Sequence, residues 1–521
     1  MQPKTVPPIE PAISPGLRRY LYFTAALTGA AILIVEILGA KMLSPYVGTS
    51  HFVWTAQIAV TLISLATGYY YGGWLVDRSQ QLRRLYYCIV LAAIYLSLTV
   101  AVIEPIAYWC LQFKLATGAL LASAILFFVP LTLLATTGPF LVRVLTQSVS
   151  SVGGNVGRLS AVSTLGSVAG TVLIGYVLIP LFPNSVTMYL TAALLMAVAA
   201  GYFLAWGKRD PGKLALVIGM ALGLAGGGFG VQRASRASLD GLQELARANS
   251  NFGRLQVLQT EDGRRYYLND FLTQNTYDPV AKKSVSMFTA MLHGLAHAYT
   301  PHVNDVLCIG LGVGIVPMQF VNEGAQVDVV EINPAVVPLA RKYFDLQPDR
   351  FNLVIGDGRY FINRANRKYD AIILDAFLGD SSPSHLMTRE AFGAMQRVLR
   401  TNGVLVINSF GGFDRNNDFL TASLDKTLKA VFRSVRIHAA GSGNIFFVAA
   451  DQPELSLLSS ANLELAHPSI RHQIQDAFAS VQHVNPRHGR VLSDDFNPVE
   501  FYDAANRETI RRQLATSMRQ R

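Results

Sequence analysis

The feature that most constrains the fold is a set of four short apolar runs between Val306 and Asp375. Each run is rich in β-branched residues, ends in glycine or an acid, and is separated from the next by a segment of helical length. The runs are Val306–Gly310, Val327–Glu331, Leu353–Asp357 and Tyr369–Asp375. Strands that alternate with helices predict a parallel sheet in an α/β fold. The carboxyl ends of such strands lie along one edge, where the ligands of these sheets bind.

The first two strand ends predict a nucleoside site. Gly310, Gly312 and Gly314 follow the first run, and glycine lets backbone N–H groups approach a ligand closely at the positive end of the next helix. Glu331 ends the second run. In dinucleotide-binding folds an acid at this position accepts hydrogen bonds from two ribose hydroxyls.

Acids at the third and fourth strand ends argue against NAD as the ligand, although the glycine spacing alone would suit it. Asp357, followed by Gly358, is placed to accept a hydrogen bond from an adenine amino group. Asp375 lies where a reacting centre would be. A nucleotide fold without activity is the alternative interpretation of the same pattern.

These motifs resemble those of the spermidine synthase (polyamine aminopropyltransferase) family over about residues 250–447. The segments that carry the resemblance are Gly310-Leu-Gly312-Val-Gly314, Val330-Glu331-Ile-Asn-Pro334, Ile355-Gly-Asp357-Gly358, Ile373-Leu-Asp375 and, similar to the family's Asp-Gly-x-x-Gln segment, Leu268-Asn-Asp270-Phe-Leu-Thr-Gln274. The ending Leu492-Ser-Asp494-Asp495-Phe-Asn-Pro498-Val-Glu500 resembles that of the membrane-fused, multi-pass members. The resemblance implies a Rossmann-like sheet of the S-adenosylmethionine methyltransferase type.

The resemblance also implies a reaction and its residues. The aminopropyl group of decarboxylated S-adenosylmethionine would pass to putrescine or a related amine, giving spermidine and methylthioadenosine. Asp375 is the candidate catalytic residue, because a diamine is protonated at neutral pH and must lose a proton before it attacks. The candidate amine-binding residues are Gln274, Asp270 and Asp380. The donor is a cosubstrate, decarboxylated or intact, and neither a bound cofactor nor a metal is expected.

Three departures from the family pattern deplete the amine half of the site and leave the nucleoside half intact. Val313 stands where the glycine loop usually carries an acid, and Phe288-Thr289-Ala290 replaces a Tyr-His-Glu segment. Leu378 replaces the second acid of an Asp-x-x-Asp loop, with Asp380 two residues further on. Two other functions therefore stay open: a methyltransferase that uses intact S-adenosylmethionine, and a membrane polyamine transporter or sensor with a nucleoside-binding domain.

The first 232 residues are far more apolar than the rest. Of the 521 residues 51% are hydrophobic and 15% charged, and the apolar excess is concentrated here. Seven stretches are near or above the roughly 20 residues that cross a bilayer; they lie at about 21–43, 52–76, 85–111, 119–142, 161–181, 186–206 and 214–231. The predicted organisation is a disordered tail at 1–17, an α-helical membrane domain at 18–232, a linker at 233–250 and a spermidine synthase-like catalytic domain at 251–521.

The basic residues raise a conflict about orientation. Arginine and lysine occupy alternate loops between the apolar stretches, which places the N-terminus in the cytoplasm. Seven spans would then put the catalytic domain outside, away from an intracellular cosubstrate. Arg233 and Arg236, after the last stretch, favour the opposite side. We expect a multi-pass cell-membrane protein with a cytoplasmic catalytic domain and one stretch that does not cross fully.

Two acids and a run of small residues inside the apolar stretches predict contacts between helices. Glu36 and Glu104 either line a polyamine path or, as we favour, make an interhelical hydrogen bond or pair with Lys41 or Arg143. The segment at 164–171 places small residues four apart, which favours close helix packing.

Weaker patterns surround the core sheet. The segment 233–250 is interpreted as a juxtamembrane helix. Residues 254–268 alternate on both sides of an Asp-Gly turn and predict a short β-hairpin, a remnant of the larger β domain of soluble family members. After the core strands we predict a helix near 389–400, a strand at 404–408, and a strand pair near 435–438 and 445–449.

Charge, cysteines and histidines mostly exclude functions. The formal charge of +10 does not indicate nucleic-acid binding, because much of it lies in loops between the apolar stretches. Cys88, Cys110 and Cys308 form no disulfide framework, and Cys308 is interpreted as a core residue. His293 and His297 are spaced i, i+4 but lack a nearby third ligand, so we interpret them as a helix face. The expected partners are polyamine and nucleoside sulfonium substrates and membrane lipid, without nucleic acid; a homodimer is left open.

Overall fold

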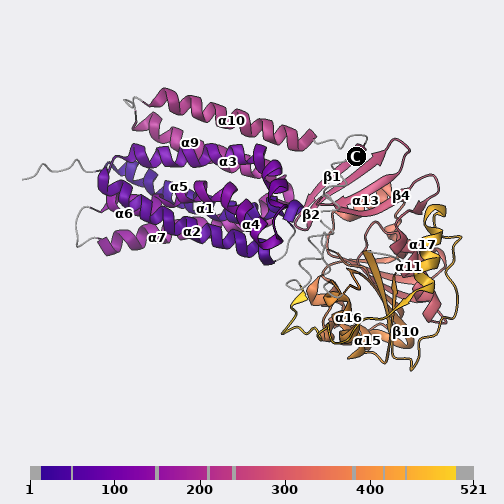
Figure 1. Cartoon of the computed structure of the whole chain (residues 1–521). Coiled ribbons are helices and arrows are strands. Elements are labelled where there is room, and N and C mark those ends of the chain that lie inside the picture. Colours follow the sequence, from indigo (N-terminus) through magenta and orange to yellow (C-terminus); the bar gives the residue numbers. More distant parts are fainter. Residues whose placement is uncertain are drawn as a thin grey trace, which may run out of the picture. The chain divides into compact units, whose positions relative to one another are not determined.

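The computed structural model describes residues 13–47, 51–146, 152–207, 212–236, 242–270, 272–377, 383–414, 417–439 and 443–499. The contacts divide the chain into two compact units. One comprises Met1–Ser44 and Phe52–Ala237, and the other comprises Pro45–His51 and Ser238–Arg521. Figure 1 shows helices throughout the described part of the first unit and sheets with surrounding helices in the second.

The first unit is helical in its described residues. Its helices are α1 (Pro15–Val47), α2 (His51–Arg78), α3 (Leu82–Cys110), α4 (Leu115–Ser123), η1 (Ala124–Phe128), α5 (Val129–Ala135), α6 (Thr137–Leu145), α7 (Val152–Leu173), η3 (Ile174–Leu178), α8 (Ile179–Leu181), α9 (Asn184–Ala205) and α10 (Lys213–Arg236). They provide seven stretches that are long and apolar enough to cross a membrane. The predicted number of candidate spans is therefore confirmed by length and composition.

Close packing inside this unit follows from the small residues of α7. A Cβ atom at Gly166 would overlap the carbonyl of Ala26 on α1, and one at Gly170 would lie 2.7 Å from the carbonyl oxygen of Ala30. The backbones can approach this closely only because these positions lack side chains. The predicted helix contact is confirmed.

The interhelical contact favoured for Glu104 is present, but its partner is Arg233, which was not predicted. The Glu104 carboxylate lies 3.6 Å from the guanidinium of Arg233 near the end of α10. Arg233 reaches it because α10 continues to Arg236 and packs beside α3.

The second unit begins with an antiparallel sheet in the order β1-β2-β3-β4-β5. Its strands are β1 (Leu242–Ser250), β2 (Gly253–Thr260), β3 (Arg265–Asn269), β4 (Leu272–Asp278) and β5 (Lys283–Ser284). The predicted hairpin is present as β2 and β3, and Gly263 in its turn has φ +87°.

Two expectations about this region are corrected. Only a short hairpin was predicted where the structure has a five-stranded sheet. Residues 242–250 form strand β1 rather than the predicted helix. The helical tendency of this polar segment is overridden because it pairs with β2 along its length, with one irregularity between Glu244 and Ala246.

The second sheet has eight strands in the order β13-β11-β12-β10-β9-β6-β7-β8. The strands are β6 (Asp305–Ile309), β7 (Gln326–Glu331), β8 (Asn352–Ile355), β9 (Tyr369–Leu374), β10 (Leu399–Gly411), β11 (Ser434–Ala439), β12 (Gly443–Ala450) and β13 (Val481–Gln482). The four predicted strands and β10 are parallel, whereas β11, β12 and β13 are antiparallel. The predicted parallel sheet is thus part of a mixed sheet.

Helices surround this sheet and explain why its core strands are apolar throughout. They are α11 (Met287–Tyr299), α12 (Ile315–Asn322), α13 (Val336–Tyr343), η4 (Pro348–Arg350), α14 (Gly358–Arg364), η5 (Ser384–Leu386), α15 (Arg389–Val398), α16 (Phe419–Lys429), η6 (Pro468–Ile470) and α17 (Arg471–Ala479). Along β6, Cys308 belongs to one apolar cluster and its neighbour Leu307 to another. Successive strand residues point to opposite faces, so both faces of the sheet are covered.

Candidate functional site

A cavity of about 1320 Å³ opens at the carboxyl ends of the parallel strands. Most of the predicted site residues line it, namely Gly310, Gly312, Glu331, Asp357, Gly358, Asp375 and Gln274. These residues come from four strand ends and from β4 of the antiparallel sheet. The chain therefore brings together in one cavity residues that are spread over about a hundred positions of sequence.

Three predicted residues are not among those that line this cavity. Gly314 precedes α12, and a Cβ atom there would overlap the side chain of Leu346. Asp270 adopts φ +47° in the turn between β3 and β4, where its carboxylate accepts a hydrogen bond of 2.9 Å from the backbone N–H of Arg254. Asp380 lies outside the described residues.

Gly310 joins the glycine loop to the opposite strand end. Its φ of +102° favours glycine, and a Cβ atom at this position would overlap the carbonyl of Asp375. The Asp375 N–H donates to the carbonyl of Ile309 at 3.0 Å. The ends of β6 and β9 are thus in direct backbone contact, which holds the glycine loop beside the candidate catalytic acid.

Glu331 supports the glycine loop from the end of β7. One carboxylate oxygen accepts the N–H of Leu311 at 2.9 Å, and the other accepts the N–H of Asn333 at 2.7 Å. Burial raises the pKa of Glu331, while these N–H donors act in the opposite direction. Each carboxylate oxygen has a second acceptor site, so ribose hydroxyls can be accepted in addition to the backbone.

Asp357 shares its carboxylate between a helix and a neighbouring loop. One oxygen caps α14 by accepting the N–H of Tyr360 at 2.8 Å, and the other lies 3.0 Å from Nε2 of His385. His385 lines the cavity as well. His385 was not predicted, because it lies 28 residues from Asp357 in a loop without a periodic pattern.

Asp375 is a partly buried carboxylate held by an amide chain. Nδ2 of Asn408 donates to it at 2.9 Å, and Oδ1 of Asn408 accepts from Nδ2 of Asn444 at 2.8 Å. Burial raises the pKa of Asp375 to about 6, against the opposing effect of the Asn408 hydrogen bond. The carboxylate is therefore mostly ionised above neutral pH and able to accept a proton. Asn408 ended the predicted strand at 404–408, and a polar residue in an otherwise apolar run was the available sequence signal for it.

The departures from the family pattern make part of the cavity wall apolar. Val313 is 2% exposed and lines the cavity, as do Phe288 and Thr289. The rings of Phe377 and Phe410, which also line it, have centroids 5.0 Å apart. Aromatic faces attract cations, so this wall suits an ammonium or a sulfonium without an acid at position 313.

Residues 286–441 match the family model described as the spermine/spermidine synthase domain. The matched segment lies within the second unit and makes up less than half of the chain. A polyamine aminopropyltransferase from Vibrio vulnificus is 38% identical over 165 residues, which cover 30% of this chain and 52% of that protein. An N-terminal histidine N-methyltransferase from Emericella nidulans is 30% identical over 220 residues, covering 38% of this chain and 39% of that protein.

Among solved structures, the spermidine synthase from Thermotoga maritima has a TM-score of 0.35 and 17% sequence identity, covering 50% of this chain and 88% of that chain. The match spans 52% of the curated aminopropyltransferase and 39% of the curated methyltransferase. The synthase domain and the aminopropyltransferase relatives indicate a transferase.

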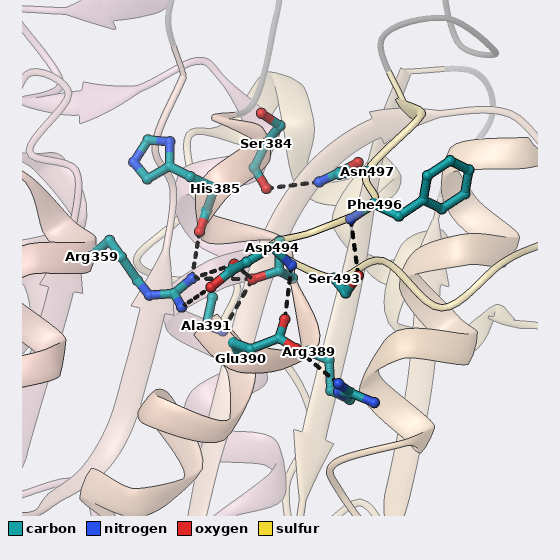
Figure 2. A network of polar contacts seen from close by, with 11 residues as sticks. Arg359, Ser384, His385, Arg389, Glu390, Ala391, Ser493, Asp494, Phe496 and Asn497 are labelled. Atoms are coloured by element: carbon teal, nitrogen blue, oxygen red, sulfur yellow. Dashed lines mark hydrogen bonds and ion pairs between the residues drawn. The ribbon is translucent and has the colours of Figure 1, made fainter.

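The C-terminal segment Leu492–Val499, here called the strap, lies beyond the matched segment, and Figure 2 shows its polar contacts with Arg359, Ser384 and Glu390. Arg359 makes an ion pair of 2.8 Å with Asp494 of the strap and donates to the carbonyl of His385 at 2.8 Å. Asp494 also accepts the hydroxyl proton of Thr388 at 2.6 Å. The strap thus fixes the backbone of the loop from which His385 reaches Asp357.

Two further contacts anchor the strap to the same loop and to α15. The Asp494 N–H donates to Glu390 at 3.0 Å, and Nδ2 of Asn497 donates to the carbonyl of Ser384 at 2.9 Å. The ending that resembles the membrane-fused members therefore has a structural use in the synthase domain.

Asp494→Asn is expected to lower the melting temperature by a few degrees and the affinity for methylthioadenosine several-fold. The amide keeps the shape but loses the charge that pairs with Arg359, and a partly exposed charged hydrogen bond contributes about 1 kcal/mol. Fluorimetry and calorimetry measure the two effects. The control is Asp495→Asn at the adjacent exposed acid, and equal behaviour of the two variants would contradict the role of the strap.

Proposed function

We propose that this protein is a polyamine aminopropyltransferase that converts putrescine or a related amine and decarboxylated S-adenosylmethionine to spermidine and methylthioadenosine. The observation that carries the proposal is one cavity in which the glycine loop, Glu331 and Asp357 lie together with Asp375. The match of residues 286–441 to the synthase domain supports it.

In the proposed reaction an amine nitrogen attacks the propyl carbon attached to the sulfonium sulfur. The new C–N bond forms as the C–S bond breaks, and the electron pair of the broken bond stays on the sulfur of methylthioadenosine. The proton of the amine passes to Asp375, whose raised pKa of about 6 leaves it ionised at neutral pH yet more basic than an exposed carboxylate. The ionised Asp375 also balances the cationic amine, and the shared cavity holds the two reactants together.

The nucleoside half of the donor is assigned to the strand ends. Ribose hydroxyls would donate to Glu331, whose orientation is set by the N–H groups of Leu311 and Asn333. The adenine would lie towards Asp357 and His385. The amine would lie on the side of Gln274 and the aromatic wall, where Phe377 and Phe410 supply cation–π attraction.

The deciding experiment is a product assay on purified full-length protein. The protein is given putrescine with decarboxylated S-adenosylmethionine, and separately intact S-adenosylmethionine. The proposal predicts spermidine and methylthioadenosine from the first mixture. Consumption of the intact donor alone would overturn it.

A methyltransferase is the second candidate, favoured by two observations. Val313 leaves the glycine loop without the acid that would hold the amine end of a decarboxylated donor. One curated relative is named as an N-methyltransferase. Formation of S-adenosylhomocysteine would establish this function, and binding of methylthioadenosine without turnover of either donor would instead favour a sensor or transporter.

The localisation is proposed as the cell membrane, with the synthase domain in the cytoplasm beside its metabolite substrates. Seven helical stretches can cross a membrane by length and composition. With the N-terminus in the cytoplasm, seven full crossings would place the domain outside, so the proposal requires that one stretch does not cross. Membrane lipid is a proposed partner, and a second copy of the chain is proposed as well.

A cysteine at Gln243, an exposed position on β1, is expected to resist a membrane-impermeant maleimide in intact cells and to react after lysis. The native thiols Cys88, Cys110 and Cys308 are all buried, so the wild-type chain supplies the background. Equal labelling of Gln243→Cys before and after lysis would place the synthase domain outside.

A further inference from the structure

Two histidines and a glutamate come together on helices α11 and α12. His293 and His297 lie one helical turn apart on α11, and Glu323 follows the end of α12. Nε2 of His293 is 3.0 Å from one oxygen of Glu323, and Nε2 of His297 is 2.8 Å from the other. The ligand atoms of the three residues all lie within 4.8 Å of one another. Interpreting the histidine pair as a helix face overlooked Glu323, which is 26 residues from His297.

The buried histidine gives an independent reason to expect a ligand. His293 is 5% exposed, and its buried Nε2, although 3.0 Å from a Glu323 oxygen, makes no well-aligned hydrogen bond among the described residues. An unsatisfied buried nitrogen costs roughly 1–3 kcal/mol. A cation between the three side chains would satisfy it.

We propose that His293, His297 and Glu323 bind a divalent transition metal of the Zn²⁺ class, with water as the fourth ligand. Two imidazole nitrogens and one carboxylate oxygen are ligands that zinc uses, and i, i+4 spacing presents both histidines on one helix face. Tetrahedral coordination at about 2.1 Å sets ligand atoms roughly 3.4 Å apart. The two nitrogen–oxygen separations of 3.0 and 2.8 Å lie slightly below this value, and all the ligand atoms lie within 4.8 Å of one another, so side-chain rotations would complete the site.

The surroundings of the cluster suit a metal that exchanges with solvent. The side chains of His297 and Glu323 are 37% and 38% exposed, which leaves an entry path and room for a water ligand. The ring of Phe320 lies beside both imidazoles, with centroids 4.7 Å from His293 and 5.8 Å from His297. Packing of this kind restricts the orientation of the imidazoles before the metal arrives.

The metal would connect two helices that begin at the candidate active site. Helix α11 starts at Met287 beside Phe288, and α12 starts after the glycine loop; residues at both starts line the cavity. The proposed role is structural, because metal binding adds stability to the folded form alone. The proposal does not depend on which reaction the cavity performs.

The test uses tag-free full-length protein in detergent, freed of metal by a chelator and titrated with Zn²⁺ in calorimetry. One equivalent is expected to bind and to raise the melting temperature by several degrees. Co²⁺ is expected to give the visible absorption bands of a tetrahedral site. His297→Ala and Glu323→Gln are each expected to weaken Zn²⁺ binding at least tenfold.

The control is His472→Ala, which removes the exposed i, i+4 pair of His472 with Asp476. His297 and Glu323 are chosen because their side chains are partly exposed, and circular dichroism of each variant checks that it folds. Zn²⁺ affinity that is unchanged in His297→Ala and Glu323→Gln, or no stoichiometric binding by the wild type, would overturn the proposal.

Discussion

Replacing Asp375 with asparagine is expected to lower turnover by about 10²- to 10⁴-fold while methylthioadenosine binding changes little. Asparagine keeps the shape of the side chain and can still accept the hydrogen bond from Asn408, which donates at 2.9 Å in the native chain. It cannot accept the proton of the amine or balance its charge. Steady-state kinetics and calorimetry separate the loss of turnover from the loss of binding.

The pH profile distinguishes a proton acceptor from a structural carboxylate. Because the pKa of Asp375 in the free protein is about 6, wild-type kcat/KM is expected to fall as the pH drops through 6. The residual activity of Asp375→Asn should lack this limb. The control is Asp349→Asn at a side chain that is 87% exposed, and a pH limb that persists in Asp375→Asn would contradict the assignment.

Asp375→Asn is also expected to raise the free energy of unfolding above pH 6. The pKa of Asp375 rises from 3.8 to about 6 on folding, so the folded state binds more protons than the unfolded state between these values. The stability contributed by this group is therefore greatest below pH 3.8 and falls as the pH rises to 6, by at most about 3 kcal/mol. The melting temperature of Asp375→Asn should exceed that of the wild type at pH 7.5. A lower value would show that burying the ionised carboxylate does not destabilise the folded protein.

Glu331→Gln is expected to weaken methylthioadenosine binding by about 1–3 kcal/mol. The substitution removes the charge facing the ribose and turns an amide N–H₂ towards the N–H of Leu311 or Asn333, both of which donate to Glu331. Calorimetry measures the change, with the exposed Glu261→Gln as the matched control. Unchanged affinity would show that Glu331 does not face the ribose.

A second ligand distinguishes the two proposed roles of Glu331, which are contact with the ribose and support of the glycine loop. A 2′-deoxy analogue of methylthioadenosine lacks one hydroxyl that Glu331 is proposed to accept. If the contact is direct, the effects of losing the carboxylate charge and of losing the hydroxyl on the binding free energy are not additive. Glu331→Gln should then weaken binding of the analogue less than binding of methylthioadenosine. An equal cost for both ligands would assign Glu331 to loop support alone.

The sequence determined the elements whose pattern is local. The β-branched runs ending at Gly310, Glu331 and Asp375 became strands β6, β7 and β9, because continuous apolar residues suit a sheet covered on both faces. The apolar stretches of the first unit are helices, and they could be predicted because length and hydropathy are properties of a single segment. The strand-end residues met at one edge because parallel strands share a direction.

Tertiary structure alone decided the contacts between segments that no period connects. His385 reaches Asp357 across 28 residues, and Glu323 reaches His297 across 26. Residues 242–250 became a strand against their local tendency because the edge of β2 offered backbone pairing along the segment. Asp270, which the family resemblance placed among the amine ligands, instead accepts a hydrogen bond from the backbone N–H of Arg254. Local periodicity determines on which face of a helix or strand a side chain lies. Its contact partner depends on which distant segments the fold brings beside that face.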